Sequence, residues 1–191
     1  MWNHLTRDID VADKKILSLL SEDPQLSQAE ISKRLKISQP AVSARIRKLE
    51  ERGILSHVVG TDVKKAQLFI AKVDITTNQV EDFLKSVESC PLYMNCFLTS
   101  GEHNMTCFLI GEDMKSVMSC VDSRFRQNPS IKSMQCDLVM NPTKYLVVPV
   151  KPQMDKKKTS PCGKDCSVCT FYTSDRCLGC PASINYKGKI L

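Results

Sequence analysis

Apolar residues recur at helical spacing near the start of the chain. One run extends from Ile9 to Leu20 at close to the helical period and stops before Pro24. A second run begins after Ser27, where a hydroxyl at the cap and Glu30 three residues later have the form of a capping box. The pattern therefore predicts a helix over residues 9–20 and a short helix after Ser27.

A third helical pattern follows at once. Ser38 is a suitable N-cap, Val42, Ile46 and Leu49 fall at i, i+4 and i+7, and Gly53 marks the end. Two short helices joined by a tight turn, the second of them basic on its outer face, are typical of a helix-turn-helix that places a recognition helix in the major groove of DNA. The segment 54–69 is predicted to add a hairpin wing.

The outer face of the third helix supplies the candidate DNA contacts. Some of its side chains are predicted to reach base edges and its basic ones to contact phosphates. Together they are Ser38, Gln39, Pro40, Ser43, Ala44, Arg45, Arg47 and Lys48. Further phosphate contacts are expected from Lys33, Arg34, Lys36 and Arg52. The alternative is a protein-interaction module with a solvated basic face.

The middle of the chain alternates strand and helix patterns. Apolar and β-branched runs predict four strands, over 68–75, 93–100, 105–110 and 131–140. Helical spacing predicts two helices, over 80–87 and 114–125. The order β-α-β-β-α-β is that of the ferredoxin-like split unit, in which helices cover one sheet face and the other face is left for a partner. We therefore expect an α+β fold and a homodimer formed through the open sheet face.

Composition adds an uneven distribution of charge. The 191 residues are 42% hydrophobic and 25% charged, as in ordinary globular proteins, and carry a net charge of +6. By segment, residues 1–65 carry +3, residues 66–150 carry −2 and residues 151–191 carry +5. Two basic ends around an acidic middle suit contact with a polyanion, although solvated surfaces would give the same charges.

The chain is expected to reside in the cytoplasm without a membrane partner. No apolar run approaches the length of roughly 18 residues that a membrane span requires, and MWNHLTRDID has no signal-peptide pattern. Because the cytoplasm is reducing, the ten cysteines are interpreted as metal ligands, redox groups or buried small hydrophobes before disulfides.

The stretch SQPAVSARIRKLEERGILSHVVGTD resembles the recognition helix and wing of the Lrp/AsnC, or feast/famine, transcription regulators. The similarity extends from residue 8 to about residue 140. It implies a winged helix-turn-helix joined by a strand to a βαββαβ domain, with double-stranded DNA as partner. It also implies assembly into dimers and often octamers, and the capacity to bind an amino acid or another small effector.

In that family the turn between the second and third strands of the domain contributes to an effector pocket between subunits. Gly101, Glu102, His103 and Asn104 stand at this place. Only the glycine and the first acidic side chain of the usual Gly-Asp-Tyr-Asp type sequence carry over. The alternative is a plain hairpin turn that needs Gly101 for an unusual backbone conformation.

Five cysteines crowd into the C-terminal segment with the spacing C-x-x-x-C-x-x-C-x7-C-x-x-C-P. Thiolates this close repel one another unless a cation neutralises them, and soft sulfur ligands select zinc or iron–sulfur clusters. Zinc would take four of the five, most simply Cys166, Cys169, Cys177 and Cys180, with Cys162 spare. An iron–sulfur cluster also takes four thiolates, and the compact spacing slightly favours it. A disulfide switch or reactive thiols are the alternative.

A metal or covalent staple is expected for a second reason. A segment of about thirty residues buries too little apolar surface to fold alone. The other five cysteines lack ligand spacing and are expected to be buried thiols, with a sensor role as the alternative. They are Cys90, Cys96, Cys107, Cys120 and Cys136.

These patterns predict a winged helix-turn-helix domain (1–62), a ferredoxin-like ligand-binding and oligomerisation domain (66–148), a linker (149–160) and a Cys-rich metal-binding module (161–191). The predicted function is a sequence-specific transcription regulator, not an enzyme, modulated by a metal or redox signal at the module. One alternative is an effector-controlled regulator with a purely structural zinc tail. The other is an enzyme resembling the Lrp-like siroheme decarboxylases of haem synthesis, with His57 or His103 as contacts.

Overall fold

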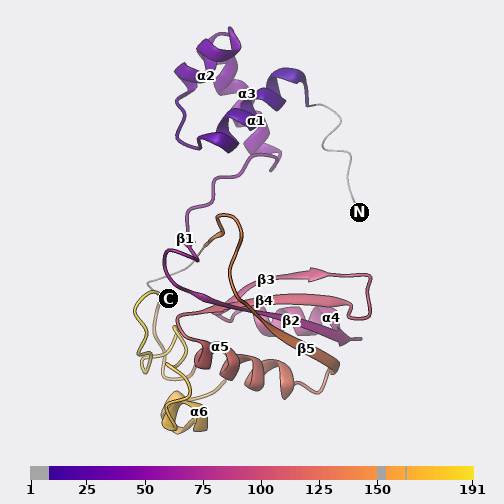
Figure 1. Ribbon diagram of the computed structural model, residues 1–191, viewed down its shortest axis with the longest axis vertical. Coiled ribbons are helices and arrows are strands. Elements are labelled where there is room, and N and C mark those ends of the chain that lie inside the picture. The colour runs from indigo at the N-terminus through magenta and orange to yellow at the C-terminus, as the bar shows by residue number, and fades with distance from the viewer. Residues whose placement is uncertain (1–8, 150–153, 162) are drawn as a thin grey trace. The chain divides into compact units, whose positions relative to one another are not determined.

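The computed structural model describes residues 9–149, 154–161 and 163–191 (Figure 1). The chain forms two compact units, Met1–His57 and Val58–Leu191. The stretch before Ile9, residues 150–153 of the predicted linker and Cys162 lie outside the described residues, together with the predictions that concern them. Within the described ranges, no helix is both long and apolar enough to span a bilayer.

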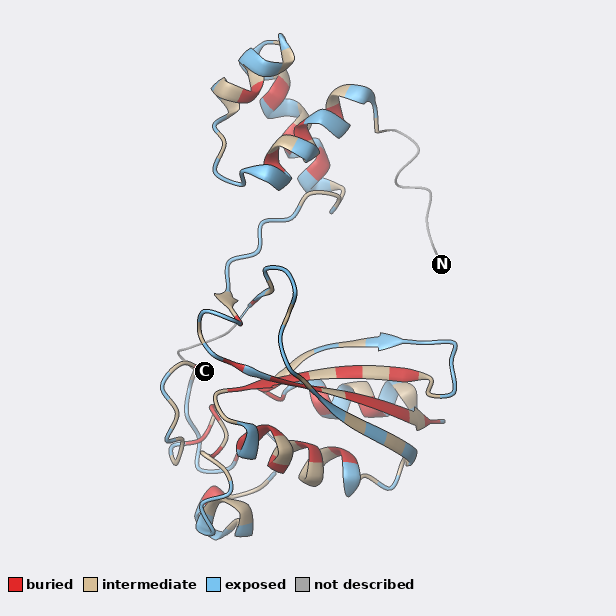
Figure 2. Cartoon of the chain, viewed as in Figure 1, coloured by how far each residue is buried: buried red, intermediate tan, exposed pale blue. Residues whose placement is uncertain are grey.

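The described part of the N-terminal unit contains three helices: α1 (Val11–Glu22), α2 (Gln28–Leu35) and α3 (Gln39–Glu51). They agree with the helices predicted from apolar spacing. Each contributes to one core, in which Ile16, Ile31 and Val42 are fully buried. The polar positions between them remain on the surface, as amphipathic spacing requires (Figure 2).

Side-chain caps fix the starts of these helices. The Ser27 hydroxyl accepts a hydrogen bond from the Glu30 backbone N–H at 3.2 Å. The predicted reciprocal bond from Glu30 is not formed, because that carboxylate accepts from Nε of Arg34 one turn on, at 3.3 Å. A full capping box occurs instead at the start of α1, between Asp10 and Asp13.

The second unit contains an antiparallel sheet with strand order β3-β4-β2-β5. Its strands are β2 (Phe69–Thr77), β3 (Tyr93–Leu98), β4 (Met105–Gly111) and β5 (Ile131–Val139). They are connected by α4 (Val80–Glu88) and α5 (Met114–Cys120), and α5 continues into a π-helical turn, Val121–Arg126. The order β-α-β-β-α-β confirms the predicted α+β, ferredoxin-like fold.

One face of the sheet is packed against both helices. Because strand side chains alternate, Val73, Ile75 and Met105 point to the same side, where they are fully buried. Opposite them, Phe83 of α4 and Phe125 of the π-helical turn meet edge to face with ring centroids 5.4 Å apart. Buried positions therefore line the packed sides of the helices and strands (Figure 2).

The segment leading into the second unit departs from the predicted hairpin wing. Before β2 begins, the only strand in the described segment 54–69 is β1 (Thr61–Asp62), and it pairs with β6 (Val147–Val148). The reason is packing, since Val63 is buried in one cluster with β6 and so belongs to the core of the second unit. Gly60 permits the approach, because a Cβ there would lie 2.2 Å from a carbonyl oxygen of β6.

The C-terminal segment has little regular structure. It contains a 3-10 turn (Cys166–Val168) and a single-turn helix, α6 (Thr170–Thr173). The described end of the predicted linker, 154–160, is bonded to this segment, because Lys157 forms a parallel bridge with Ser183. The module therefore includes residues that the sequence assigns to a spacer.

Candidate nucleic-acid interface and cysteine cavity

One side of α3 is open to solvent along most of its length. Val42, Ile46 and Leu49 point into the core of the unit. The side chains predicted to touch DNA that are exposed are Ser38, Gln39, Pro40, Ser43, Ala44, Arg47 and Lys48. Ser38 also caps the helix by accepting from the Ala41 N–H at 3.3 Å. The predicted contacts are thus on the solvent side of α3.

Arg45 differs from its neighbours because it is engaged within the unit. Its Nη1 lies 2.6 Å from Oδ2 of Asp10 and 2.7 Å from Oδ1 of Asp13, at the start of α1. A hydrogen bond from the Asp13 backbone N–H, and then one from Arg45, lowers the pKa of Asp10. Although Arg45 is predicted to contact phosphate, the structure places its guanidinium against two carboxylates, where it ties α3 to α1.

The other basic side chains differ in how strongly they are paired. Lys33 and Lys36 are exposed, and Lys36 ends α2 in the left-handed conformation with φ of 54°. Arg34 pairs with Glu30, whereas Nε of Arg47 is 3.7 Å from Glu51 with both side chains largely exposed. Exposed pairs of this kind contribute little to stability, so Arg47 remains available to DNA.

The turn at 101–104 joins β3 to β4 as predicted, and its polar side chains are used locally. Asn104 accepts from the Thr77 N–H at 3.1 Å and donates to the Thr77 carbonyl at 2.7 Å. Nδ1 of His103 lies 3.1 Å from Oγ1 of Thr76. Glu102 is exposed. The expectation that Gly101 needs an unusual backbone is wrong, because its φ is not positive and a Cβ would meet nothing closer than 4.0 Å.

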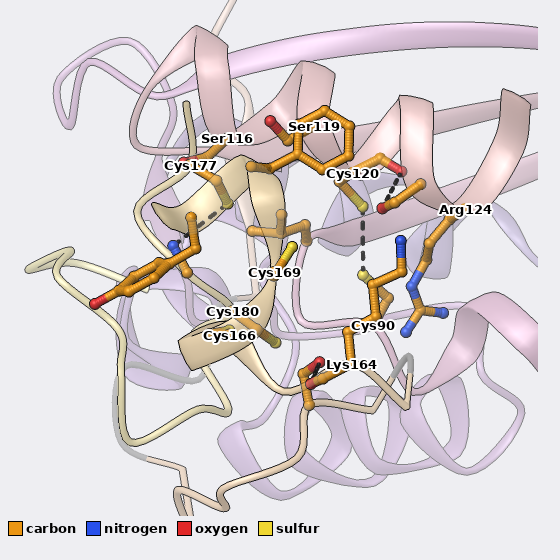
Figure 3. A pocket seen from close by; sticks show the side chains of 16 residues that line it. Cys90, Ser116, Ser119, Cys120, Arg124, Lys164, Cys166, Cys169, Cys177 and Cys180 are labelled. Atoms are coloured by element: carbon orange, nitrogen blue, oxygen red, sulfur yellow. Dashed lines mark hydrogen bonds between the residues drawn. The ribbon is translucent and has the colours of Figure 1, made fainter. Parts of the chain in front are cut away.

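The four described cysteines of the tail line one cavity of about 70 Å³ (Figure 3). Cys166 and Cys169 lie at the two ends of the 3-10 turn, and Cys177 and Cys180 come from the next loop. Gly179 gives this loop its shape, since its φ is +91° and its N–H donates to Sγ of Cys177 at 3.3 Å. Burial raises the pKa of the Cys177 thiol.

These cysteines line one cavity, but their side chains are not positioned to coordinate a metal ion together. In the described ranges, no three Cys, His, Asp or Glu side chains are arranged so that they hold a metal ion as they stand. Cys162, the fifth predicted ligand, is not among the described residues. The prediction of a metal site therefore stays a prediction, and its four described candidate ligands line the same cavity.

Four of the five cysteines outside the tail form pairs that their sequence spacing does not indicate. Cys96 and Cys107 are opposite each other on β3 and β4, with sulfur atoms 2.9 Å apart. Cys90 and Cys120 are 3.9 Å apart and line the cysteine cavity. The hydrogen bond with Cys120 lowers the pKa of Cys90 to about 6, against the effect of burial. Of the expected buried thiols, Cys90 and Cys107 are buried, whereas Cys96, Cys120 and Cys136 are half-buried.

The residues that hold the tail on the domain were not found from the sequence. Ser119 Oγ donates to the Arg176 carbonyl and Ser116 Oγ accepts from the Leu178 N–H, both at 2.7 Å. The only sequence signal is two serines at i, i+3 on the apolar side of α5, where each is buried. One helical turn is thus hydrogen-bonded to the backbone on both sides of Cys177.

Glu112, just before α5, is a second attachment point. It accepts from the Tyr186 hydroxyl at 2.5 Å and from the backbone N–H groups of Lys189, Ile190 and Leu191 at 2.6 to 2.9 Å. Burial alone would raise the pKa of Glu112, but these hydrogen bonds leave it lowered. We call this arrangement the Glu112 clamp.

Two family models match the chain. A winged helix-turn-helix DNA-binding model covers residues 9–56, and a Lrp/AsnC ligand binding domain model covers residues 68–148. Together they confirm the predicted fold class. The C-terminal segment after residue 148 lies beyond both matches.

Known proteins support the same assignment. The transcriptional regulator AzlB of Bacillus subtilis is 27% identical over 150 residues, which are 74% of this chain and 96% of AzlB. An uncharacterised HTH-type regulator from Pyrococcus abyssi is 30% identical over 135 residues, 65% of this chain and 83% of its own. A transcriptional regulator from Neisseria meningitidis, solved in complex with L-Met, has a TM-score of 0.62 at 25% identity over 71% of this chain and 92% of its own.

These relatives are transcriptional regulators rather than enzymes, which confirms that prediction and sets the decarboxylase alternative aside. The two histidines proposed for that alternative have local partners, since His57 lies 3.2 Å from Glu50 and His103 lies beside Thr76. With a helix-turn-helix followed by a βαββαβ domain, and with relatives matched over most of their length, the chain belongs to the Lrp/AsnC family of transcription regulators.

Proposed function

We propose that this Lrp/AsnC regulator reads a specific DNA sequence with the exposed side of α3, and that the state of its C-terminal cysteine module changes its affinity for DNA. The observation that carries the first part is the exposed row Gln39, Ser43 and Arg47 along one side of α3. An amide, a hydroxyl and a guanidinium are groups that discriminate base edges, and arginine pairs bidentately with guanine.

Affinity selection from random DNA, followed by titration of the selected duplex, tests this part. Arg47→Ala is expected to weaken binding by about 1–3 kcal/mol and to relax specificity at one base pair. Lys48→Ala is expected to weaken binding to all sequences similarly and to lower the salt-dependence slope by about 1. Lys132→Ala, an exposed lysine of β5, is the control and should bind normally. Wild-type affinity and specificity in Arg47→Ala would reject α3 as the reader.

The contact between the module and α5 supports the second part. The module is hydrogen-bonded to a helix of the domain that the family model describes as ligand-binding. A change in the module can therefore bias the domain to which it is attached. Replacing Cys166 and Cys169 by serine is expected to change affinity for the selected duplex at least about fivefold, within the usual range of coupling between sites. Cys136→Ser is the control, and equal affinity in all three proteins would reject the modulation.

Assembly through the open sheet face is proposed from an exposed aromatic side chain on that face. Phe97, near the end of β3, is 52% exposed and meets Phe108 edge to face on the side of the sheet opposite the helices. Sedimentation analysis should give a homodimer or a higher assembly such as an octamer. Phe97→Glu should shift the protein toward monomer, because a charge would be buried at the contact. A monomeric wild type would contradict this arrangement.

An effector at the 101–104 turn is the second candidate, favoured by the Neisseria regulator that was solved with L-Met. The exposed carboxylate of Glu102 can pair with an amino group. Amino acids should then raise the melting temperature in proportion to binding, and Glu102→Gln should abolish the shift. The absence of any shift would leave the turn as a hairpin connection only.

A further inference from the structure

The cysteine cavity lies at the contact between the C-terminal module and α5. Cys166, Cys169, Cys177 and Cys180 line it from the module, and Cys120 lines it from α5 (Figure 3). We propose that the four module cysteines bind one thiolate-ligated metal centre, a zinc ion or an iron–sulfur cluster, and that Ser116 and Ser119 of α5 position its second cysteine pair. This inference rests on the proposed function, since it names the chemistry of the module to which DNA affinity is coupled.

Both cysteine pairs are held by local bonds that suit metal ligands. In the first pair, the Cys169 N–H donates to the Cys166 carbonyl at 3.2 Å and closes a tight turn. In the second, the Gly179 N–H donates to the Cys177 sulfur at 3.3 Å. A backbone N–H that donates to a cysteine sulfur is a common support for a metal ligand. Gly179 cannot be replaced easily, because a Cβ would lie 3.0 Å from the Asn185 carbonyl oxygen.

The module has few other means of stabilising itself. Its buried side chains among the described residues include Cys166, Pro181 and Leu191, and most of its positions are exposed or half-buried. A segment of this size usually depends on a metal or a disulfide. The four sulfur atoms are not arranged as a ligand set as they stand, so metal binding must draw them closer and tighten the module.

The contacts with α5 make the site a joint property of module and domain. Ser119 bonds to Arg176 and Ser116 to Leu178, the two residues that flank Cys177. The Ser116 hydroxyl also donates to Asp113 at 3.0 Å, so both of its roles are filled. Because α5 fixes the backbone around Cys177, metal binding and docking of the module are thermodynamically linked.

Metal and sulfide analysis of the full chain tests the ligands. The protein is purified without oxygen, and one sample is reconstituted with zinc and another with iron and sulfide. We expect about one zinc per chain, or iron and sulfide in similar amounts with visible absorbance. Cys177→Ser should lose most of this content, and Cys136→Ser should keep it. The proposal is overturned if neither sample retains metal, or if Cys177→Ser retains as much as wild type.

A second pair of variants tests docking without touching a ligand. In the metal-loaded protein, Ser116→Ala and Ser119→Ala should speed amide exchange at Arg176–Leu178 and weaken metal binding about tenfold in chelator competition, as expected when support for a ligand is removed. Ser133→Ala, at an exposed serine of β5, is the control. Unchanged exchange and affinity would reject the joint site. Both experiments are done without DNA and therefore test the metal site independently of DNA binding. If metal binds but DNA affinity does not change, only the proposed modulation is refuted.

Discussion

Arg45 lies on the recognition helix and yet holds two carboxylates of the preceding helix. Its side chain is 34% exposed, whereas Asp13, one of its partners, is 9% exposed. A carboxylate this enclosed depends on its partner, because removing one member of such a pair leaves an uncompensated charge. Arg45 therefore contributes to the stability of the N-terminal unit. Arg47, two residues later, is largely exposed and is not needed for that stability.

Arg45→Met is expected to lower the free energy of unfolding of the N-terminal unit by about 1 kcal/mol, a value that allows for the partial exposure of the pair. Arg47→Met makes the same change in charge and should cost less than about 0.5 kcal/mol. Urea denaturation followed by circular dichroism measures both. Equal costs would mean that the contacts of Arg45 with Asp10 and Asp13 contribute nothing measurable.

The Glu112 clamp predicts a pH dependence of tail docking. Hydrogen bonds lower the pKa of Glu112 below its ordinary value of 4.5 despite burial. Because the pKa of Glu112 is lowered in the folded protein, the clamp stabilises docking fully at pH values above the ordinary pKa. This stabilisation is lost as the pH falls through the pKa of Glu112 in the folded protein. Amide protection factors of Lys189–Leu191, measured by NMR between about pH 7 and pH 3, should therefore collapse at the acid end.

Glu112→Gln is expected to abolish that transition, because an amide cannot accept from all these donors at once. Protection of the last three residues should be low at every pH. Glu88→Gln, an exposed position on α4, should behave as wild type. A wild-type pH profile in Glu112→Gln would show that another group holds the tail.

At the scale of elements, the Glu112 clamp requires a glycine at position 188. A Cβ on Gly188 would lie 2.1 Å from the Tyr186 hydroxyl and 2.7 Å from Oε1 of Glu112. Gly188→Ala is therefore expected to reduce protection of the C-terminal amides by about tenfold, equivalent to the loss of one hydrogen bond. Gly101→Ala is the matched control, because its Cβ would have room and its φ is ordinary. Equal behaviour of the two variants would contradict the close packing at Gly188.

The helices and strands of the two domains follow from residue patterns because each buries one face. Apolar spacing identifies α3 from Val42, Ile46 and Leu49, and it identifies the helix over 114–125 although its second half is π-helical. The hairpin wing could not be predicted correctly from its own residues. The conformation of this segment depends on β6, because β1 pairs with β6 some eighty-five residues further along the chain. Pairing over such distances has no local pattern.

The candidate site divides in the same way. The exposed residues of α3 and the spacing of the tail cysteines are local patterns, and the sequence identifies both. The Cys90–Cys120 pair, the two docking serines and the Glu112 clamp each join elements that are distant along the chain. Only the fold brings them together, so their residues had no distinctive signal.

At the scale of the whole molecule, the two compact units should unfold separately. Each has its own core, with Leu49 at 2% exposure in the first and Phe125 fully buried in the second. Calorimetry is expected to resolve two transitions rather than one two-state transition. Leu49→Ala should lower the free energy of unfolding of the first unit alone, by about 2–5 kcal/mol. Phe125→Ala should lower that of the second unit alone, by about 3–5 kcal/mol. A single transition shifted by both substitutions would show that the units unfold together.

The pairing of β1 with β6 has a consequence for how such chains diversify. The peptide from the helix-turn-helix joins the ferredoxin-like domain at β1, and the peptide to the tail leaves it at β6, the antiparallel neighbour. Gene fusion at this end of the domain therefore adds a segment without changing any strand, because chain ends that lie together at a surface tolerate additions. Transplanting the cysteine tail to another family member would then also require the side chains that receive it, among them Ser116, Ser119, Glu112, Cys90 and Leu92.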